Sequence, residues 1–170
     1  MKTALFVMDA QEDYIGEQRN KEKFDYDDDH LIRNINERIS YYEEHKMPVL
    51  YIVTAYPNNF FFKKFIKYGI TGSKGSKIDK RIKIVSENYF EKQSKDAFDN
   101  KNLIKFIKEN NIQKVELAGV DASFCIAKTA ESARKYNLKV NILNECVATV
   151  YPDKITKISK KLIQNGVIYI

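Results

Sequence analysis

Cysteine, histidine and tryptophan are scarce in this chain of 170 residues, which has two cysteines, two histidines and no tryptophan. Two cysteines do not make a disulfide framework, so we expect the protein to work in a reducing cytoplasm. His30 and His45 lie among charged residues near the two ends of a predicted helix, and we expect both on the surface. Neither follows a predicted strand, which excludes Cys/His proteases. Without a cluster of histidine, cysteine and carboxylate ligands, most zinc enzymes are excluded as well.

Long apolar runs and glycine-rich phosphate loops are also missing. The N-terminal run in MKTALFVMDA is too short for a signal peptide or a membrane span, and charged residues follow it, so we expect no membrane partner. Gly69, Gly72 and Gly75 do not have the GxGxxG spacing. No GKS or GKT sequence follows a strand, and we therefore reject a nucleotide-binding site.

The formal net charge of +6 is not gathered in one place. Lysines interleave with acidic residues throughout, and residues 25–29 form an acidic cluster. Nucleic-acid binding needs a denser Lys/Arg face with aromatic residues between the charges. We interpret the excess of lysine as a solvated basic surface and expect no nucleic-acid partner.

The alternation of apolar and amphipathic segments predicts the fold. With 44% hydrophobic residues the chain has enough core for one domain over residues 1–170. Strands are predicted at residues 3–8, 49–54, 82–85, 114–118, 140–143 and 167–170, and helices at residues 29–46, 102–110 and 153–164 and around Cys125. This order is typical of a Rossmann-like, doubly wound α/β fold, which is a three-layer α/β/α sandwich with a mostly parallel six-stranded sheet.

Asp9 directly follows the first predicted strand, whose continuous apolar run indicates burial on both faces. Open α/β sheets bind their ligands at the carboxyl ends of such strands. A carboxylate among apolar neighbours therefore indicates a functional group, although a cap on the following turn is the alternative.

Cys125 lies where the fourth strand passes into a helix. Gly119 ends the strand, and Asp121 or Ser123 can cap the helix, which places Cys125 in its first turn. There the helix dipole favours a thiolate, and free backbone N–H groups can hold an oxyanion. The alternative is a small buried apolar residue. Because neither histidine is placed to act as a base, Asp9 is the best candidate for that role.

Three segments resemble the isochorismatase-like cysteine hydrolases, which include nicotinamidases and related amidohydrolases. The sequence VMDAQEDY around Asp9 is similar to the family's Asp-x-Gln-x-x-Phe opening, with Tyr14 in place of phenylalanine. KQSKDAF resembles the family's lysine segment and selects Lys92, with Asp96 where serine is usual. GVDASFC has the family's spacing between its glycine and Cys125. The resemblance covers nearly the whole chain.

The resemblance implies a catalytic triad of Asp9, Lys92 and Cys125 that works without a cofactor. Cys125 attacks a carbonyl carbon, Asp9 moves the proton, and Lys92 keeps Asp9 ionised and favours the thiolate. The resemblance also implies a cis peptide between Val120 and Asp121. It would direct the N–H of Asp121, together with that of Cys125, at the oxyanion.

The segment after the second strand bears on the substrate. Nicotinamidases of this family carry an Asp-x-His sequence and a further histidine there as a metal site, whereas residues 54–62 read TAYPNNFFF. We therefore predict a metal-independent hydrolase for a small amide or related C–N bond. Candidates for the pocket of this small-molecule substrate are Gln11, Tyr14, Tyr56 and Phe60, although each aromatic ring is equally well explained as ordinary core or rim.

Other functions remain open at this point. A catalytically silent binding or scaffold protein of the same fold is one alternative, and a nicotinamidase or an isochorismatase is a less favoured one. A receiver-like signalling domain is a third, but only Asp9, Glu12 and Asp13 approximate its carboxylate cluster. The resemblance also implies a homodimer or homotetramer, for which the aromatic residues at positions 60–65 are a predicted contact surface.

Overall fold

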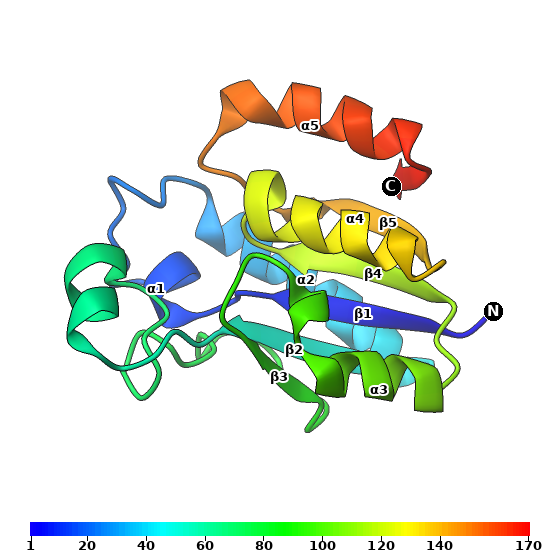
Figure 1. The fold of residues 1–170 in the computed structure, drawn as a ribbon, viewed down its shortest axis with the longest axis horizontal. Coiled ribbons are helices and arrows are strands. Elements are labelled where there is room, and N and C mark those ends of the chain that lie inside the picture. The colour runs from blue at the N-terminus through cyan, green and yellow to red at the C-terminus, as the bar shows by residue number, and fades with distance from the viewer.

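A parallel sheet forms the centre of the computed structural model, which describes residues 1–170. Its six strands lie in the order β3-β2-β1-β4-β5-β6 and all run parallel (Figure 1). They are β1 (Thr3–Met8), β2 (Val49–Thr54), β3 (Tyr89–Lys92), β4 (Lys114–Gly119), β5 (Lys139–Val147) and β6 (Val167–Tyr169). The predicted α/β fold with a doubly wound six-stranded sheet is confirmed, and the sheet is wholly rather than mostly parallel.

Helices cover both faces of this sheet. Side chains of α2 pack into the core on one face, those of α3 and α4 pack on the other, and α5 contacts α4 and β6 (Figure 1). None of these helices combines the length and apolar character needed to cross a membrane. The helical elements are α1 (Glu12–Ile15), α2 (Asp28–Glu44), α3 (Lys101–Glu109), α4 (Ala127–Lys135) and α5 (Pro152–Gln164), the π-helical turns η1 (Phe62–Ile66) and η3 (Ala122–Ile126), and the 3-10 turn η2 (Ala97–Asp99).

The pattern of side chains along β1 explains its central position. Phe6 and Met8 are fully buried in the core shared with α3 and α4, while Leu5 and Val7 are buried in the core shared with α2. Each such side chain stabilises the fold by about 1.5–3 kcal/mol. A strand buried on both faces belongs in the interior of a parallel sheet. The carboxyl end of β1 consequently lies between those of β2 and β4.

The bounds of α2 differ slightly from the predicted helix at residues 29–46. Its N-cap is Asp27, rather than Asp28 or Asp29, and the Asp27 carboxylate accepts a hydrogen bond of 2.9 Å from the backbone N–H of His30. The helix stops at Glu44 because Lys46 has a φ of 53°, which a right-handed helix does not allow.

The predicted position of the third strand is wrong. Residues 82–85 form no strand, and β3 lies further along the chain. The backbone N–H of Lys83 donates to the Asn36 side chain at 2.8 Å, and that of Val85 donates to the Tyr51 hydroxyl at 3.0 Å. Side chains therefore take the hydrogen bonds that pairing with a neighbouring strand would need, while the apolar pattern of the segment reflects packing against the core.

The fifth strand is longer than the predicted residues 140–143. It continues to Val147, so that Cys146 lies within the strand rather than after it. Cys146 is buried, and this burial raises the pKa of its thiol to about 11. A buried thiol in a strand is typical of a packing role, which we assign to Cys146.

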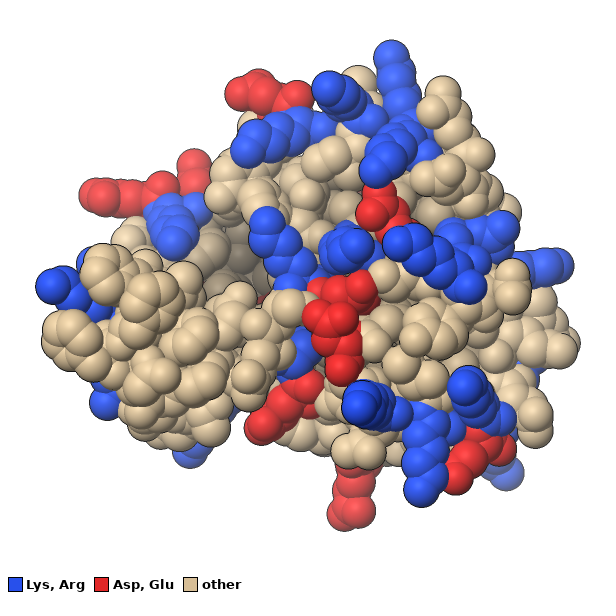
Figure 2. All heavy atoms as spheres, viewed as in Figure 1, with Lys and Arg blue, Asp and Glu red and all other residues tan.

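An exposed aromatic patch lies on η1 and the residues just before it. Phe60, Phe61 and Phe65 are 75%, 57% and 62% exposed. In Figure 1 this segment is part of the lobe at the left, which Figure 2 shows covered mainly by uncharged residues on the side facing the viewer. Contiguous exposed aromatic side chains are typical of a contact surface.

We predict that the protein assembles into a homodimer or homotetramer through this patch. The double substitution Phe61→Ser and Phe65→Ser should reduce the mass measured by light scattering to that of one chain, because it removes the apolar area of the contact. The matched control is Ile163→Ser, which changes an equally exposed apolar residue on α5. A wild-type protein that measures 19.9 kDa, the mass of one chain, at working concentration would contradict the prediction.

Candidate active site

The carboxyl ends of neighbouring strands bring the predicted catalytic residues together. Asp9 follows β1, Lys92 is the last residue of β3, and Cys125 lies in η3, soon after β4. Lys92 pairs in register with Thr54, the last residue of β2. These strands lie side by side in the sheet. The corrected position of β3 puts Lys92 at the carboxyl ends of the strands, beside the other two residues.

The backbone around Asp9 and Gly119 is unusual in two ways that position the site. Asp9 adopts a φ of 51°, an uncommon conformation for a residue other than glycine. Gly119 has a φ of 113°, and a Cβ atom there would lie 1.9 Å from the carbonyl oxygen of Met8. Only glycine therefore lets the end of β4 approach β1 so closely.

Lys92 is the centre of a buried network of polar groups. Its Nζ lies 2.9 Å from Oδ2 of Asp9 and donates to Oγ1 of Thr54 at 2.7 Å, to the carbonyl oxygen of Ser94 at 3.2 Å and to Sγ of Cys125 at 3.4 Å. Thr54 in turn donates to Oδ1 of Asp9 at 2.9 Å. The Lys92 and Asp9 side chains are 0% and 4% exposed. The ion pair is thus shielded from water and its hydrogen-bonding capacity is largely filled.

The charges in this network determine the protonation of Cys125. Burial and the Asp9 carboxylate raise the pKa of Cys125 to about 12, and Lys92 offsets only part of that rise. This corrects the expectation of a thiolate favoured by Lys92 and the helix dipole. Burial works against the charged form of Lys92, but Asp9 and Cys125 outweigh it and raise the pKa of Lys92. At neutral pH Cys125 is therefore a thiol that faces a carboxylate.

The backbone of the segment before Cys125 is unusual. The peptide bond between Val120 and Asp121 is cis, as the resemblance implied. Asp121, one of the two predicted caps, accepts from the backbone N–H of Ser123 at 2.7 Å. The N–H of Asp121 itself donates to no backbone carbonyl. Cys125 lies in a π-helical turn that precedes α4, rather than in the first turn of an α-helix.

A cavity of about 110 Å³ opens onto Cys125. Figure 2 shows the surface hollowed beside the left-hand lobe, in the region where Figure 1 places the carboxyl end of β1. Four of the nine residues that line it are aromatic, and the only charged groups among them are the carboxylates of Asp9 and Asp121. The lining residues are Asp9, Tyr14, Phe24, Tyr26, Thr54, Tyr56, Val120, Asp121 and Cys125.

Two of the four predicted pocket residues line this cavity and two do not. Tyr14 and Tyr56 lie in its wall. Gln11 is fully buried outside it, where its side-chain amide donates to the carbonyl oxygens of Thr54 and Ser76 and accepts from the N–H of Thr54. Gln11 therefore ties β2 to a distant loop. Phe60 points to solvent from the exposed patch.

The sequence-based prediction missed Thr54, Phe24 and Tyr26 as site residues. Phe24 and Tyr26 lie in a polar segment, residues 18–29, whose composition is typical of a surface loop. Arg19, a buried residue of the same segment, donates to the carbonyl oxygens of Phe24 and Tyr26 at 2.9 and 3.0 Å. In the sequence, the two aromatic residues among charged neighbours were the only indication that this loop lines the cavity.

The residues present do not fit the metal site of nicotinamidases. The segment after β2, residues 54–62, contains no histidine and no carboxylate. Nowhere in the chain do three or more His, Cys, Asp or Glu side chains gather as metal ligands would.

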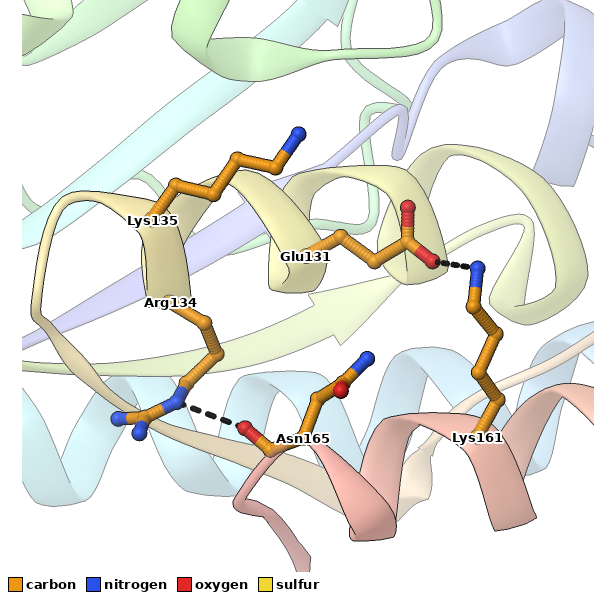
Figure 3. A pocket seen from close by; sticks show the side chains of 5 residues that line it. All are labelled: Glu131, Arg134, Lys135, Lys161 and Asn165. Atoms are coloured by element: carbon orange, nitrogen blue, oxygen red, sulfur yellow. Dashed lines mark hydrogen bonds and ion pairs between the residues drawn. The ribbon is translucent and has the colours of Figure 1, made fainter.

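A second hollow lies between the C-terminal ends of α4 and α5 (Figure 3). It is at the amino ends of the strands, away from the site around Cys125. Its basic side chains are largely engaged within the protein. Lys161 pairs with Glu131 at 2.7 Å, and Nε of Arg134 donates to the carbonyl oxygen of Asn165 at 3.0 Å. It contains none of the predicted catalytic residues.

A family model described as "Isochorismatase domain" matches residues 3–170. "Isochorismatase family protein 2A" of Dictyostelium discoideum is 24% identical over 167 residues, which cover 97% of this chain and 76% of the relative.

Two solved structures share the fold. The pyrazinamidase of Pyrococcus horikoshii in complex with zinc superposes with a TM-score of 0.83 at 19% identity, over 100% of this chain and 99% of that one. The N-carbamoylsarcosine amidase from Thermoplasma acidophilum gives a TM-score of 0.80 at 24% identity, over 99% and 95% of the two chains. At these identities the superpositions show the fold alone.

The protonation of Cys125 leads to a testable prediction about its reactivity. Asp9→Asn removes a charge that, together with burial, raises the pKa of Cys125, so alkylation by iodoacetamide at pH 8 should become about three- to fourfold faster for each unit by which that pKa falls, because the more abundant thiolate is also a weaker nucleophile. Lys92→Met should slow alkylation, because Lys92 lowers the same pKa. Mass spectrometry of the modified peptide gives both rates.

The control for these rates is Cys125→Ala, in which only Cys146 can react. An Asp9→Asn protein whose Cys125 reacts no faster than wild type would show that Asp9 does not set the pKa of the thiol.

Proposed function

The chain belongs to the isochorismatase-like hydrolase family, and we propose that it is a metal-independent cysteine hydrolase that cleaves a small amide or related C–N bond through a thioester. The observation that carries the proposal is the contact of Cys125 with a buried Asp9–Lys92 pair at the wall of a small cavity. The fold neighbours named pyrazinamidase and N-carbamoylsarcosine amidase add support, because both names describe amidases.

In the first step Asp9 takes the proton of the Cys125 thiol while sulfur attacks the substrate carbonyl. A C–S bond forms, and the electron pair of the C=O double bond moves to oxygen. Asp9 suits the role of base because Lys92 and Thr54 hold its carboxylate in place. Since the thiol has a raised pKa, the proton moves in concert with substrate attack, and no resting thiolate is needed.

The oxyanion that forms in this step needs hydrogen-bond donors. We assign this role to the backbone N–H groups of Asp121 and Cys125. The Asp121 carboxylate does not compete for these donors, because it already accepts from the N–H groups of Ser123 and Val150 and from the hydroxyl of Thr149.

Collapse of this intermediate completes the acyl transfer. The C–N bond breaks, and Asp9 gives its proton to the departing nitrogen, which leaves an acyl thioester on Cys125. Asp9 then removes a proton from water, and the resulting attack on the thioester releases a carboxylic acid and restores the thiol. Lys92 keeps Asp9 ionised between the acyl transfer and the hydrolysis of the thioester.

The experiment that tests the proposal is a screen of small primary amides and carbamates for release of ammonia by the purified protein. Cys125→Ala and Asp9→Asn should each remove nearly all turnover. The double variant should be scarcely worse than either single one, because groups that share a step do not act additively. Lys92→Met should retain an intermediate activity.

Cys146→Ala is the matched control. It should lower the melting temperature, because it leaves a small cavity in a buried strand, while turnover stays near the wild-type value. Full activity in Asp9→Asn together with loss of activity in Cys146→Ala would contradict the assignment of the site.

Chelation gives a further prediction. Treatment with EDTA should leave turnover unchanged, because residues 54–62 lack the ligands of a metal site. The control is an EDTA-treated sample to which zinc or iron has been returned. Activity that disappears with EDTA and returns with either metal would contradict the metal-independent mechanism.

A further inference from the structure

Asp96 is a buried carboxylate that has no role in the mechanism above. It stands where the resembling segment of the family has serine, and it is 8% exposed. None of the ion pairs in the protein includes it. A carboxylate is costly to bury without a cation, so the hydrogen bonds that it accepts must stabilise it.

The two oxygens of the Asp96 carboxylate bind different parts of the fold. Oδ1 accepts from the backbone N–H of Phe98 at 2.9 Å and caps the turn η2. This bond is local, and a serine in the same position could also make it. Oδ2 accepts from the hydroxyl of Ser132, a buried residue of α4 that lies 36 positions further along the chain. The second bond therefore joins the loop after β3 to a helix.

A further hydrogen bond fixes the same loop to α4. The N–H of Ala97 donates to the hydroxyl of Thr129 at 3.1 Å, and both residues are fully buried. Thr129 and Ser132 are three positions apart, which places them on one face of the helix. α4 directly continues η3, the turn that contains Cys125. The loop is thus bound to the helical segment that carries the candidate nucleophile.

The other end of this loop contacts Lys92. Nζ of Lys92 donates to the carbonyl oxygen of Ser94 at 3.2 Å and to Sγ of Cys125 at 3.4 Å. The hydroxyl of Ser94 accepts from the N–H of Asp96 at 2.9 Å and donates to the carboxylate of Asp99. Asp96 therefore lies between two connections, one to the lysine and one to the helix of the thiol.

We propose that Asp96 is a positioning residue that holds Lys92 beside Cys125 by binding the loop after β3 to α4. A serine side chain ends one atom earlier than that of aspartate and can keep only the local bond to Phe98. The inference deepens the proposed hydrolysis and rests on it for the role of the thiol. The position of the lysine can nevertheless be measured without a substrate.

The rate at which iodoacetamide alkylates Cys125 at pH 8 reports this position. Lys92 lowers the pKa of the thiol, so a lysine that is no longer held in place slows the reaction. Asp96→Ser and Ser132→Ala should each slow alkylation about two- to fourfold, and the double variant should be no slower than either. Loosened packing alone would have the opposite effect, because a half-buried thiol that becomes more exposed reacts faster.

Two further variants show whether Asp96 acts through the lysine. In the Lys92→Met background, Asp96→Ser should leave the alkylation rate of that background unchanged. Asp96→Asn is the conservative variant in the wild-type background. Its amide oxygen can accept from Phe98 while its amide nitrogen donates to the hydroxyl oxygen of Ser132, so the rate should stay close to that of the wild type.

Glu116→Gln is the matched control for stability. Glu116 is another buried carboxylate, but it lies on β4 and pairs with Arg38 of α2 and with Lys114. The substitution should lower the melting temperature because it weakens a buried ion pair, and it should leave the alkylation rate of Cys125 unchanged.

Three results would overturn the inference: alkylation in Asp96→Ser or Ser132→Ala that is as fast as in the wild type or faster, an Asp96→Asn protein as slow as Asp96→Ser, or equal slowing by Asp96→Ser with and without Lys92. If Asp96→Ser does not fold, Ser132→Ala tests the same link from α4. The expected pattern in a protein that cleaves no amide would support the role of Asp96 and reject the proposed hydrolysis.

Discussion

The buried ion pair between Lys92 and Asp9 is the interaction on which the site depends. Removing such charges from water costs several kcal/mol per ion, and only good geometry with further hydrogen bonds compensates for it. Here Thr54 and the carbonyl of Ser94 supply those bonds. The pair joins β1 to β3 across β2, and it therefore fixes the positions of the carboxyl ends of these three strands relative to one another. Loss of either partner would leave an unpaired buried charge, at a cost of about 3–5 kcal/mol.

The same pair explains how Cys125 can be both inert at rest and reactive with a substrate. Burial raises the pKa of the thiol to about 12, and the neighbouring carboxylate acts in the same direction. A resting thiol is protected from adventitious oxidation, which requires the thiolate. In the proposed mechanism, the carboxylate that disfavours ionisation of the thiol is also the group that accepts its proton when a carbonyl carbon arrives. Activation is thus tied to occupation of the cavity.

The sheet and two of the three triad residues were predictable from the residues themselves. Asp9 and Cys125 follow apolar runs that end in a carboxylate and in a glycine, and strand ends are where α/β folds place their sites. Lys92 was predicted only through the family resemblance, because the apolar run at residues 82–85 was interpreted as the third strand. The positions of Phe24 and Tyr26 depend on hydrogen bonds that Arg19 donates within the same loop, and no helix or strand periodicity encodes them.

Detection of the acyl enzyme tests the central claim most directly. The protein is mixed with an amide from the screen and quenched in acid within the first turnover, and intact-mass and peptide mass spectrometry follow. We predict a mass increase equal to the acyl group, located on Cys125, labile to hydroxylamine and absent from Cys125→Ala. Turnover with no adduct in the wild type and undiminished turnover in Cys125→Ala would contradict catalysis by this thiol.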